Sequence, residues 1–498
     1  MRREARPLAG TLLALACVAG AGPVAGGEAG LRNGDFAAWA DGAPAAWRVE
    51  VGATSGNGPA SRVAPVEGGG LALGGDAATG TWRLVAQTVP VEVGGVYRLR
   101  FEARAEGLRK EQGQFGSAYV GLVTRADGRL SMPTLRAEMT FRATWAPCEA
   151  LARATTTELD VAAFLSMSGR LEIRDARVEE IAPEGAFDAL VAHVGRTYPF
   201  FAERGVNWPA HAAPFRTRAV AAAGDAAAFA AVLGEMLAGL KDVHVWIDRP
   251  GTPRVVPWAP KVETGFDAKA TWARLTAPQQ VAKVAIRGRF GGDIGYVAIG
   301  ALPAPGAPDA APLEHAFLAS HDGVRGLVVD LRPCGGGDET TALKLAAGLA
   351  RHVGVYARRR FRSGPAPDDF GPWVDAILRP VRGGDGPPPF AGPVVVILGP
   401  ACGSSGEGLA QMLEVLPNVT TVGRPTRGAS GNPAPIPLPG GIDVWTSRWQ
   451  DQRANGEPLE GKGVVPQVLV EATGPGDPAL DKALEILRGT LAKDTPPK

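Results

Sequence analysis

The chain has 498 residues, a length that favours two to four domains over a single hydrophobic core. Its formal net charge at pH 7 is +1, which argues against a nucleic-acid-binding surface and against an acidic tail. The hydrophobic fraction of 45% is ordinary for a globular protein, and 67 glycines with 43 prolines indicate many turns.

Residues 1–21 have the pattern of an export signal. The basic start MRREARP precedes the apolar run LAGTLLALACVAGAG, which is too short to span a bilayer, and AGA at 19–21 is a suitable cleavage site. Lipidation at Cys17 is the alternative, but the ALA before it lacks the usual bulky aliphatic residue. No later segment is apolar for long enough to span a membrane, so a secreted or periplasmic protein is expected.

The cysteines and histidines suggest neither a disulfide scaffold nor a metal site. Removal of the signal leaves Cys148, Cys334 and Cys402, an odd and small number. The sequence contains no CxxC motif or paired Cys/His cluster, and its 6 histidines are scattered. We therefore expect no metal and no other cofactor.

Residues 31–181 are predicted to form a β-sandwich. The segments TWRLVAQTVPV, GVYRLRFEARA and RLEIRDARVEEI alternate apolar and polar residues between glycine turns, as antiparallel strands do. Together with the opening LRNGDFAAW, they resemble the jelly rolls of carbohydrate-binding modules of the galactose-binding-like type. The resemblance implies the sandwich and makes polysaccharide a candidate partner. Trp39, Trp47 and Trp82 could stack on sugars, or they could pack within the sandwich.

Residues 184–250 are predicted to be mainly helical. The segments FDALVAHVGRTYPFF and AAAFAAVLGEMLAGL repeat apolar residues every three or four positions, and RGVNWPAH separates them. The segment LKDVHVWID then ends this region in a strand-like tail.

From 285 to 490, predicted strands and helices alternate. IGYVAIGAL, GLVVDLR, PVVVIL and TTVG read as strands, whereas ETTALKLAAGLARH and the segment after PACGSSGEG read as helices. This order predicts a mainly parallel sheet with crossover helices. Ligands of such sheets bind beyond the carboxyl ends of the strands, where the turns PCGGGD and PACGSSGEG fall.

These two turns fit the chemistry of acyl transfer. One can present a serine at a helix start, and the other can expose backbone N–H groups to the oxyanion of a tetrahedral intermediate. Glycines 335 to 337 allow the backbone to approach a ligand closely. Each turn alone is weak evidence, because glycine turns are more often structural.

In combination, the turns resemble a known family. LVVDLRPCGGGD, VVVILGPACGSSGEGLAQML and TVGRPTRGASGNP, in this order, resemble the C-terminal processing (tail-specific) serine peptidases and their tricorn-type relatives. YPFFAERGVNW and LKDVHVWI resemble the helical region ahead of that core. The resemblance covers about residues 185 to 490 and implies a ClpP/crotonase-like α/β core, serine peptidase activity and a peptide or protein substrate. The segment between WIDRPG and IGYVAI is too short for a PDZ domain, so recognition of substrate tails is not carried over.

The resemblance assigns the nucleophile to Ser404. In the family the nucleophile lies three positions before a glutamate, which is Glu407 here. Ser405 is the alternative, a hydroxyl in the first helical turn that caps the helix or meets solvent. Glu407 itself is expected to be structural, because a carboxylate is stabilised at a helix N-terminus.

The base is expected to be a histidine. Ala429 stands where many family members carry a lysine base, which excludes that base here. The tricorn-like branch uses a histidine and a glutamate, and these match His244 in KDVHVW and Glu460 in PLEGKGVVP. That branch has a serine before the histidine, bridging it to the glutamate, whereas this chain has Val243. Glu460 must then act directly or through water, or Asp242 or another acid must serve.

Two further features surround the expected oxyanion hole. Its donors would be the amide of Gly335 or Gly336 together with that of Ser404 or Ser405. Cys334 and Cys402 replace the asparagine and serine that the family usually has beside this position. They are either two small buried thiols or a disulfide that stiffens or switches the site.

Three functions remain open at this stage. The favoured one is a secreted serine peptidase with Ser404, His244 and Glu460, because a binding protein needs no such set at three separate positions. A catalytically weak binding protein of the same fold, holding apolar or peptide ligands, is the second. The third is a chain targeted to polysaccharide by its sandwich, with the core as passenger.

Overall fold

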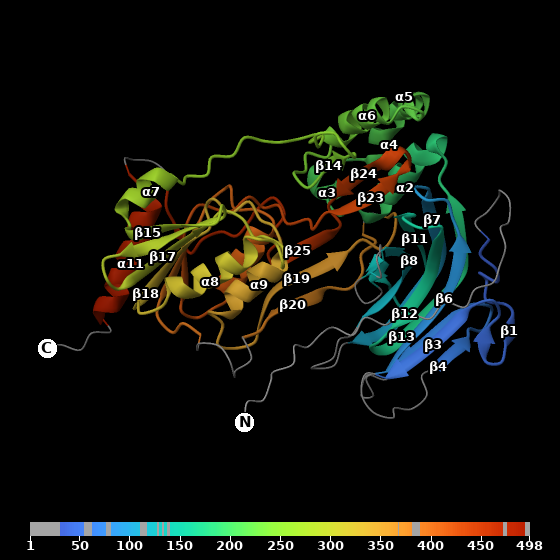
Figure 1. Ribbon diagram of the computed structural model, residues 1–498, viewed down its shortest axis with the longest axis horizontal. Coiled ribbons are helices and arrows are strands. Elements are labelled where there is room, and N and C mark those ends of the chain that lie inside the picture. Colours follow the sequence, from blue (N-terminus) through green and yellow to red (C-terminus); the bar gives the residue numbers. More distant parts are fainter. Residues whose placement is uncertain are drawn as a thin grey trace. The chain divides into compact units, whose positions relative to one another are not determined.

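The computed structural model describes residues 30–53, 62–75, 81–109, 117–126, 129–131, 134–136, 140–366, 368–380, 389–471 and 476–493. The expected signal, residues 1–21, and Cys17 lie outside these residues. The chain divides into two compact units, Met1–Ala182 and Pro183–Lys498, which are blue to teal and green to red in Figure 1. Within the described ranges, no helix combines the length and apolar character needed to cross a membrane.

The first unit consists mainly of two antiparallel sheets. One has the strand order β10-β8-β12-β6-β3, with β9 paired to β8, and the other has the order β11-β7-β13-β5-β4. Their bounds are β3 Arg48–Ala53, β4 Arg62–Pro65, β5 Leu71–Gly75, β6 Thr81–Pro90, β7 Val96–Arg109, β8 Ala118–Ala126, β9 Arg129–Ser131, β10 Thr134–Arg136, β11 Ala146–Arg153, β12 Glu158–Leu165 and β13 Ser168–Glu180. A short ribbon of β1, Trp39–Ala40, and β2, Ala43–Pro44, precedes them.

The two sheets bury one shared core, as the alternating sequence pattern predicts. Leu99 and Phe101 of β7 lie in the same buried cluster as Leu122 of β8 and Leu159 of β12. Because β7 belongs to one sheet and β8 and β12 to the other, the unit is a β-sandwich.

The three tryptophans considered for sugar binding have packing partners inside this unit. Trp47 is buried, with its ring centroid 4.8 Å from that of Phe36. Trp82 stacks with Phe164 at 6.2 Å, and the Trp39 indole donates to the carbonyl of Phe36 at 2.7 Å. These contacts favour the packing interpretation over sugar stacking.

The second unit begins with short helices. They are η2 Pro183–Gly185, α2 Ala186–Thr197, α3 Phe201–Arg204, α4 Trp208–Ala212, η3 Ala213–Phe215, α5 Arg216–Ala222 and α6 Ala226–Ala238. Asp225 caps α6 by accepting hydrogen bonds from the amides of Ala227 and Ala228. Tyr198 and Phe200, between α2 and α3, are buried and anchor this turn. The short strand β14, Trp246–Asp248, follows.

A seven-stranded sheet forms the centre of this unit, in the order β15-β16-β17-β18-β21-β22-β26. Strands β15 to β17 pair antiparallel, and β17 to β26 pair parallel. The bounds are β15 Thr276–Val281, β16 Ala285–Phe290, β17 Ile294–Ile299, β18 Gly326–Asp330, β21 Val394–Leu398, β22 Val419–Gly423 and β26 Val468–Leu469.

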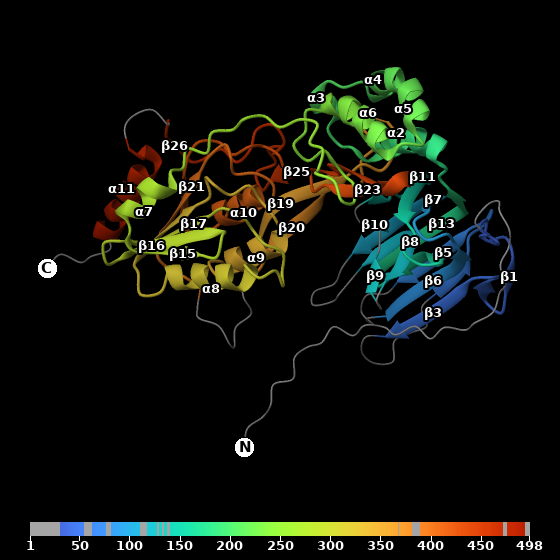
Figure 2. The same cartoon turned by 45° about the horizontal axis from the view of Figure 1, so that its top comes forward.

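Helices cover both faces of this sheet because its central strands are apolar on both sides. Val394 and Val396 of β21 lie in a buried cluster with residues of α8 Ala310–Ser320, α9 Glu339–Ala347 and α10 Ser405–Glu414. Val395 and Ile397 lie in another cluster with α11 Pro478–Lys493. Figure 2 shows α8 and α11 on either side of the strands, with α7 Ala268–Arg274 near α11.

Two three-stranded antiparallel sheets complete the second unit. One has the order β20-β19-β25, formed by β19 Gly354–Phe361, β20 Val374–Leu378 and β25 Trp449–Arg453. The other has the order β14-β24-β23, formed with β23 Ala434–Leu438 and β24 Ile442–Thr446, between which lies η4 Pro439–Gly441. Trp246 of β14 stacks on Trp445 of β24 at 5.1 Å. The segment of β14, which precedes the large sheet in the sequence, is thereby paired with β24, which follows β22.

Candidate active site

Ser404 lies in the turn between β21 and α10. Its φ of 54° and ψ of −132° are strained for a residue with a side chain, a feature that clusters at functional sites. The amide of Ser404 donates to the carbonyl of Ala429 at 2.8 Å, which fixes the turn. The Ser405 hydroxyl donates to the carbonyl of Gly337 at 2.8 Å, whereas that of Ser404 makes no hydrogen bond within the described part of the chain. Of the two serines, Ser404 therefore has the free hydroxyl.

Glu407, in the first turn of α10, binds the segment that accepts the Ser404 amide. It is fully buried and accepts hydrogen bonds from the Thr426 hydroxyl at 2.5 Å, the Gly428 amide at 2.6 Å and the Ala429 amide at 2.8 Å. Burial raises the pKa of Glu407 to about 7 despite these three donors. Its role is structural, but it acts as a clamp on the segment 426–429 and not only through the helix dipole.

The PCGGGD loop packs directly against the Ser404 turn. A Cβ on Gly336 would lie 2.6 Å from the Cβ of Ser404, so only glycine fits there, and its φ is +110°. The amide of Gly335 already donates to the carbonyl of Gly300 at 3.2 Å. The amide of Gly336 donates to the sulfur of Cys334, which is a weak acceptor. The amides of Gly337 and Ser405 donate to no group in the described residues. Sequence reasoning missed Gly337, because spacing does not show which amide is already used.

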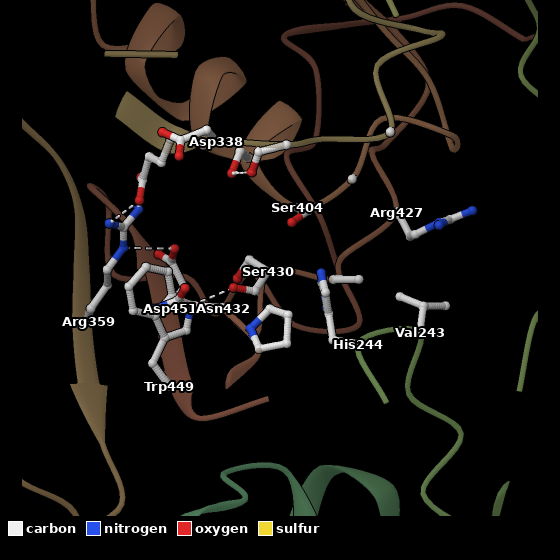
Figure 3. Close-up of a pocket in the computed structure, with 18 of the residues that line it drawn as sticks. Val243, His244, Asp338, Arg359, Ser404, Arg427, Ser430, Asn432, Trp449 and Asp451 are labelled. Atoms are coloured by element: carbon white, nitrogen blue, oxygen red, sulfur yellow. Dashed lines mark hydrogen bonds and ion pairs between the residues drawn. The ribbon is translucent and has the colours of Figure 1, made fainter. Parts of the chain in front are cut away.

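His244 lies two residues before β14 and reaches the other side of the same cavity. Figure 3 shows its imidazole directed toward Ser404 across the opening. The residue is buried, and this burial lowers its pKa, with Arg427 and Arg204 adding to the effect and Asp242 opposing it. The imidazole is therefore neutral near pH 7, the form that can accept a proton.

Glu460 is not in contact with His244. Its carboxylate pairs with the guanidinium of Arg204, and no hydrogen bond or ion pair within the described residues joins it to the imidazole. Burial raises the pKa of Glu460, and the neighbouring Asp242 carboxylate adds to the rise. The carboxylate that lies close to the ring is that of Asp242, with Oδ1 3.9 Å from Nδ1 of His244. The resemblance-based pairing of Glu460 with His244 is thus not formed in this structure.

Ser404 and His244 open into a cavity of about 670 Å³. Its walls are formed by some of the residues within the segments 243–254, 335–340, 403–408, 427–433 and 449–451, together with Arg359. Among the described residues, no three His, Cys, Asp or Glu side chains gather as a metal-binding group.

Comparison with known proteins identifies the centre of the second unit. The sequence profile of peptidase family S41 matches residues 293–470. This segment is an S41 peptidase domain. For this segment, the match supports a serine-type peptidase related to the C-terminal processing proteases. No curated protein matches the chain.

Solved structures resemble the chain over a similar region. A "putative peptidase" from Parabacteroides merdae is 24% identical with a TM-score of 0.51, over 61% of this chain and 96% of that one. A lipoprotein from Streptococcus agalactiae is 14% identical with a TM-score of 0.42, over 62% and 96%. The photosystem II D1 C-terminal processing protease is 16% identical with a TM-score of 0.40, over 61% and 97%. The first of these similarities supports the fold of the second unit.

The far wall of the S41 cavity carries a buried charge network that the sequence did not indicate. Arg359 of β19 donates to Glu339 at 2.8 Å and to Asp451 at 3.2 Å, and its guanidinium lies 4.2 Å from the Trp449 ring centroid. Burial raises the pKa of Asp451 to about 6. Figure 3 shows this network across the cavity from His244. It gives the S41 cavity a polar, rigid wall.

The two cysteines beside the Ser404 turn are free thiols in this structure. Cys334 and Cys402 are both buried, and both sulfurs lie within 3.3 Å of the point that a Cβ on Gly406 would occupy. Burial raises the pKa of Cys334 to about 11 and raises that of Cys402 as well. Both therefore stay protonated near neutral pH and pack as small apolar groups, which favours the buried-thiol interpretation over a disulfide.

Proposed function

We propose that the protein is an exported serine peptidase in which Ser404 is the nucleophile and His244 the general base. The observation that carries the proposal is that a strained serine with a free hydroxyl and a buried, neutral histidine line one cavity of the S41 domain. Ser404 and His244 come from separate elements. Purely structural roles would not require both of them to line the same cavity, whereas a nucleophile and its base must do so.

The proposed reaction begins with attack by Ser404 Oγ on a peptide carbonyl carbon. The Oγ proton passes to Nε2 of His244 as the C–O bond forms. When the tetrahedral intermediate collapses, the C–N bond breaks and the imidazolium gives this proton to the leaving amine. A water molecule, deprotonated by His244, then attacks the acyl carbon. The ester C–O bond to Ser404 breaks, the imidazolium returns the proton to Oγ, and the second product leaves as a carboxylic acid.

The proposed oxyanion hole lies between the Ser404 turn and the PCGGGD loop. Gly336 and Ser405 are its expected donors; Gly337 is added because its amide has no acceptor among the described residues. The amide of Gly335 stays with Gly300. Fixed donors of this kind stabilise charge that develops in the transition state, and removing one typically lowers kcat by about 10² to 10³.

The remaining features of the proposal follow from the sequence. The signal-like residues 1–21 support export, with lipidation at Cys17 as the less favoured route. The sandwich is proposed to be of jelly-roll type and the catalytic core of ClpP/crotonase type. A peptide or protein is the proposed substrate. Polysaccharide is the alternative second partner, and binding by the fragment 31–181 tests it.

A serine-reactive fluorophosphonate probe tests this function. Wild-type protein is expected to be labelled at Ser404, as located by mass spectrometry, while Ser404→Ala and His244→Ala lose labelling. Ser405→Ala is the matched control, and it should retain labelling because its hydroxyl is bonded to Gly337. Absence of labelling in folded wild-type protein would favour the binding-protein alternative, and labelling at Ser405 would overturn the choice of nucleophile.

A further inference from the structure

One polar atom of the proposed base has no partner. Nδ1 of His244 is buried and makes no hydrogen bond within the described residues, although buried polar atoms are almost always paired. Its distance of 3.9 Å to Asp242 Oδ1 is about 1 Å longer than a hydrogen bond. Catalytic hydrogen bonds are often long in ligand-free sites and shorten when substrate binds.

Asp242 has one acceptor position left, and it belongs to the oxygen nearest the ring. Its Oδ2 accepts from the Tyr198 hydroxyl at 3.0 Å and the Ser447 hydroxyl at 2.8 Å. Its Oδ1 accepts from the His244 amide at 2.8 Å. A carboxylate offers about four acceptor positions, so Oδ1 can take one more donor. These bonds also hold the carboxylate still in three directions.

We propose that Asp242, and not Glu460, is the positioning residue that orients His244. The proposal rests on the function proposed above. By accepting from Nδ1–H, Asp242 fixes the tautomer in which Nε2 carries the lone pair that faces Ser404, and it stabilises the imidazolium that forms. Tyr198 and Ser447 hold Asp242 in place.

Glu460 has a different role in this arrangement. Its carboxylate is held by Arg204 of α3, and Val243 removes the serine through which a glutamate could reach the ring. Glu460 therefore ties the helical region to the segment after β25. Its other oxygen, Oε2, is buried without a hydrogen-bond partner among the described residues, so the obstacle to an action of Glu460 on His244 is the missing bridging group and not the pairing with Arg204.

The charged groups around His244 are consistent with these different roles of Asp242 and Glu460. Asp242 lies beside His244, Arg427 of the segment after β22 and Arg204 of α3 act on it electrostatically, and Glu460 of the segment after β25 acts on Asp242. Burial raises the pKa of Tyr198, so its hydroxyl remains a donor to Asp242. Asp242 is the group that opposes the lowering of the His244 pKa.

The first test compares Asp242→Asn with Glu460→Gln by the rate of fluorophosphonate labelling between pH 5 and 9. Asp242→Asn should lower the rate at pH 7 by roughly 10² or more and move the acid limb of the profile to lower pH. Glu460→Gln should keep the position of that limb, and Ser447→Ala should give a smaller loss than Asp242→Asn. The proposal would be overturned if the acid side of the pH profile moved in Glu460→Gln but stayed at the wild-type position in Asp242→Asn.

The second test does not require a reactive nucleophile. In ¹⁵N-histidine-labelled Ser404→Ala protein, the Nδ1–H proton of His244 should resonate at low field when bonded to Asp242. The signal should disappear in Ser404→Ala/Asp242→Asn and persist in Ser404→Ala/Glu460→Gln. If it persists without Asp242, the positioning role is refuted. If wild-type protein fails to label but the signal behaves as expected, the peptidase function fails and the Asp242 contact stands.

Discussion

Glu407→Gln should change how stability depends on pH. The pKa of Glu407 is about 7 in the folded chain against an ordinary value of 4.5, because burial disfavours the charged carboxylate. Because the pKa is higher in the folded than in the unfolded chain, protonation of Glu407 stabilises the fold. This contribution to the free energy of unfolding is fully present below about pH 4.5 and is lost as pH rises through about 7. The difference of about 2.5 units corresponds to roughly 3 kcal/mol of unfolding free energy.

Glutamine at position 407 does not titrate, so the free energy of unfolding of the variant does not fall through ionisation of this side chain. It also turns an amide N–H₂ toward one of the three donors, the Ala429 amide or its neighbours, at a cost of about 1–3 kcal/mol at every pH. At pH 4.5 the variant should therefore have a lower free energy of unfolding than wild type. Between pH 4.5 and pH 8 the difference, variant minus wild type, should rise by up to about 3 kcal/mol in favour of the variant.

Urea unfolding followed by tryptophan fluorescence at several pH values measures this difference. Glu235→Gln is the control of opposite sign, because its exposed carboxylate pairs with Arg218, which lowers its pKa. Its contribution is present above the unfolded pKa and is lost as pH falls. A difference between wild type and Glu407→Gln that stays constant from pH 4.5 to 8 would refute the reasoning about Glu407.

Three further predictions can be checked directly. Gly336→Ala should abolish probe labelling at Ser404, since the new Cβ would lie 2.6 Å from the serine Cβ; unchanged labelling would contradict the packing of the two turns. The unfolded mature protein should show three reactive thiols without reductant, from Cys148, Cys334 and Cys402, and a count of one would establish a bridge. The fragment 31–181 should not bind insoluble polysaccharide in a pull-down, since Trp39, Trp47 and Trp82 are engaged in packing; binding that Trp82→Ala removes would restore the glycan hypothesis.

The sequence predicted those parts of the site that depend on local pattern. Apolar runs such as VVVIL at 394–398 mark buried parallel strands, and a small-residue turn before an amphipathic helix located Ser404. The order of the motifs gave the peptidase family, which the match over 293–470 confirms. The placement of Ser404 and His244 in one cavity is consistent with that prediction, and their catalytic roles remain to be tested.

The parts that depended on contacts between distant segments could not be predicted. Nothing near Asp242 in the sequence indicates that Tyr198 and Ser447 donate to it. The pairing of Glu460 with Arg204 joins residues more than two hundred positions apart, so a family pattern alone assigned the glutamate to the histidine. Burial decides these pairings, because a buried carboxylate takes whichever donors the fold brings within reach.

On the proposed role of His244, the pairing of β14 with β24 bears on when activity can arise during synthesis. His244 is held in position by strands that end at Thr446 and by Ser447, all of which leave the ribosome after Ser404. A nascent or truncated chain that stops before Ile442 carries the nucleophile but no strand to hold the base. On the proposed roles of Ser404 and His244, such chains should be inert, and an active site should form only after nearly the whole polypeptide has been completed.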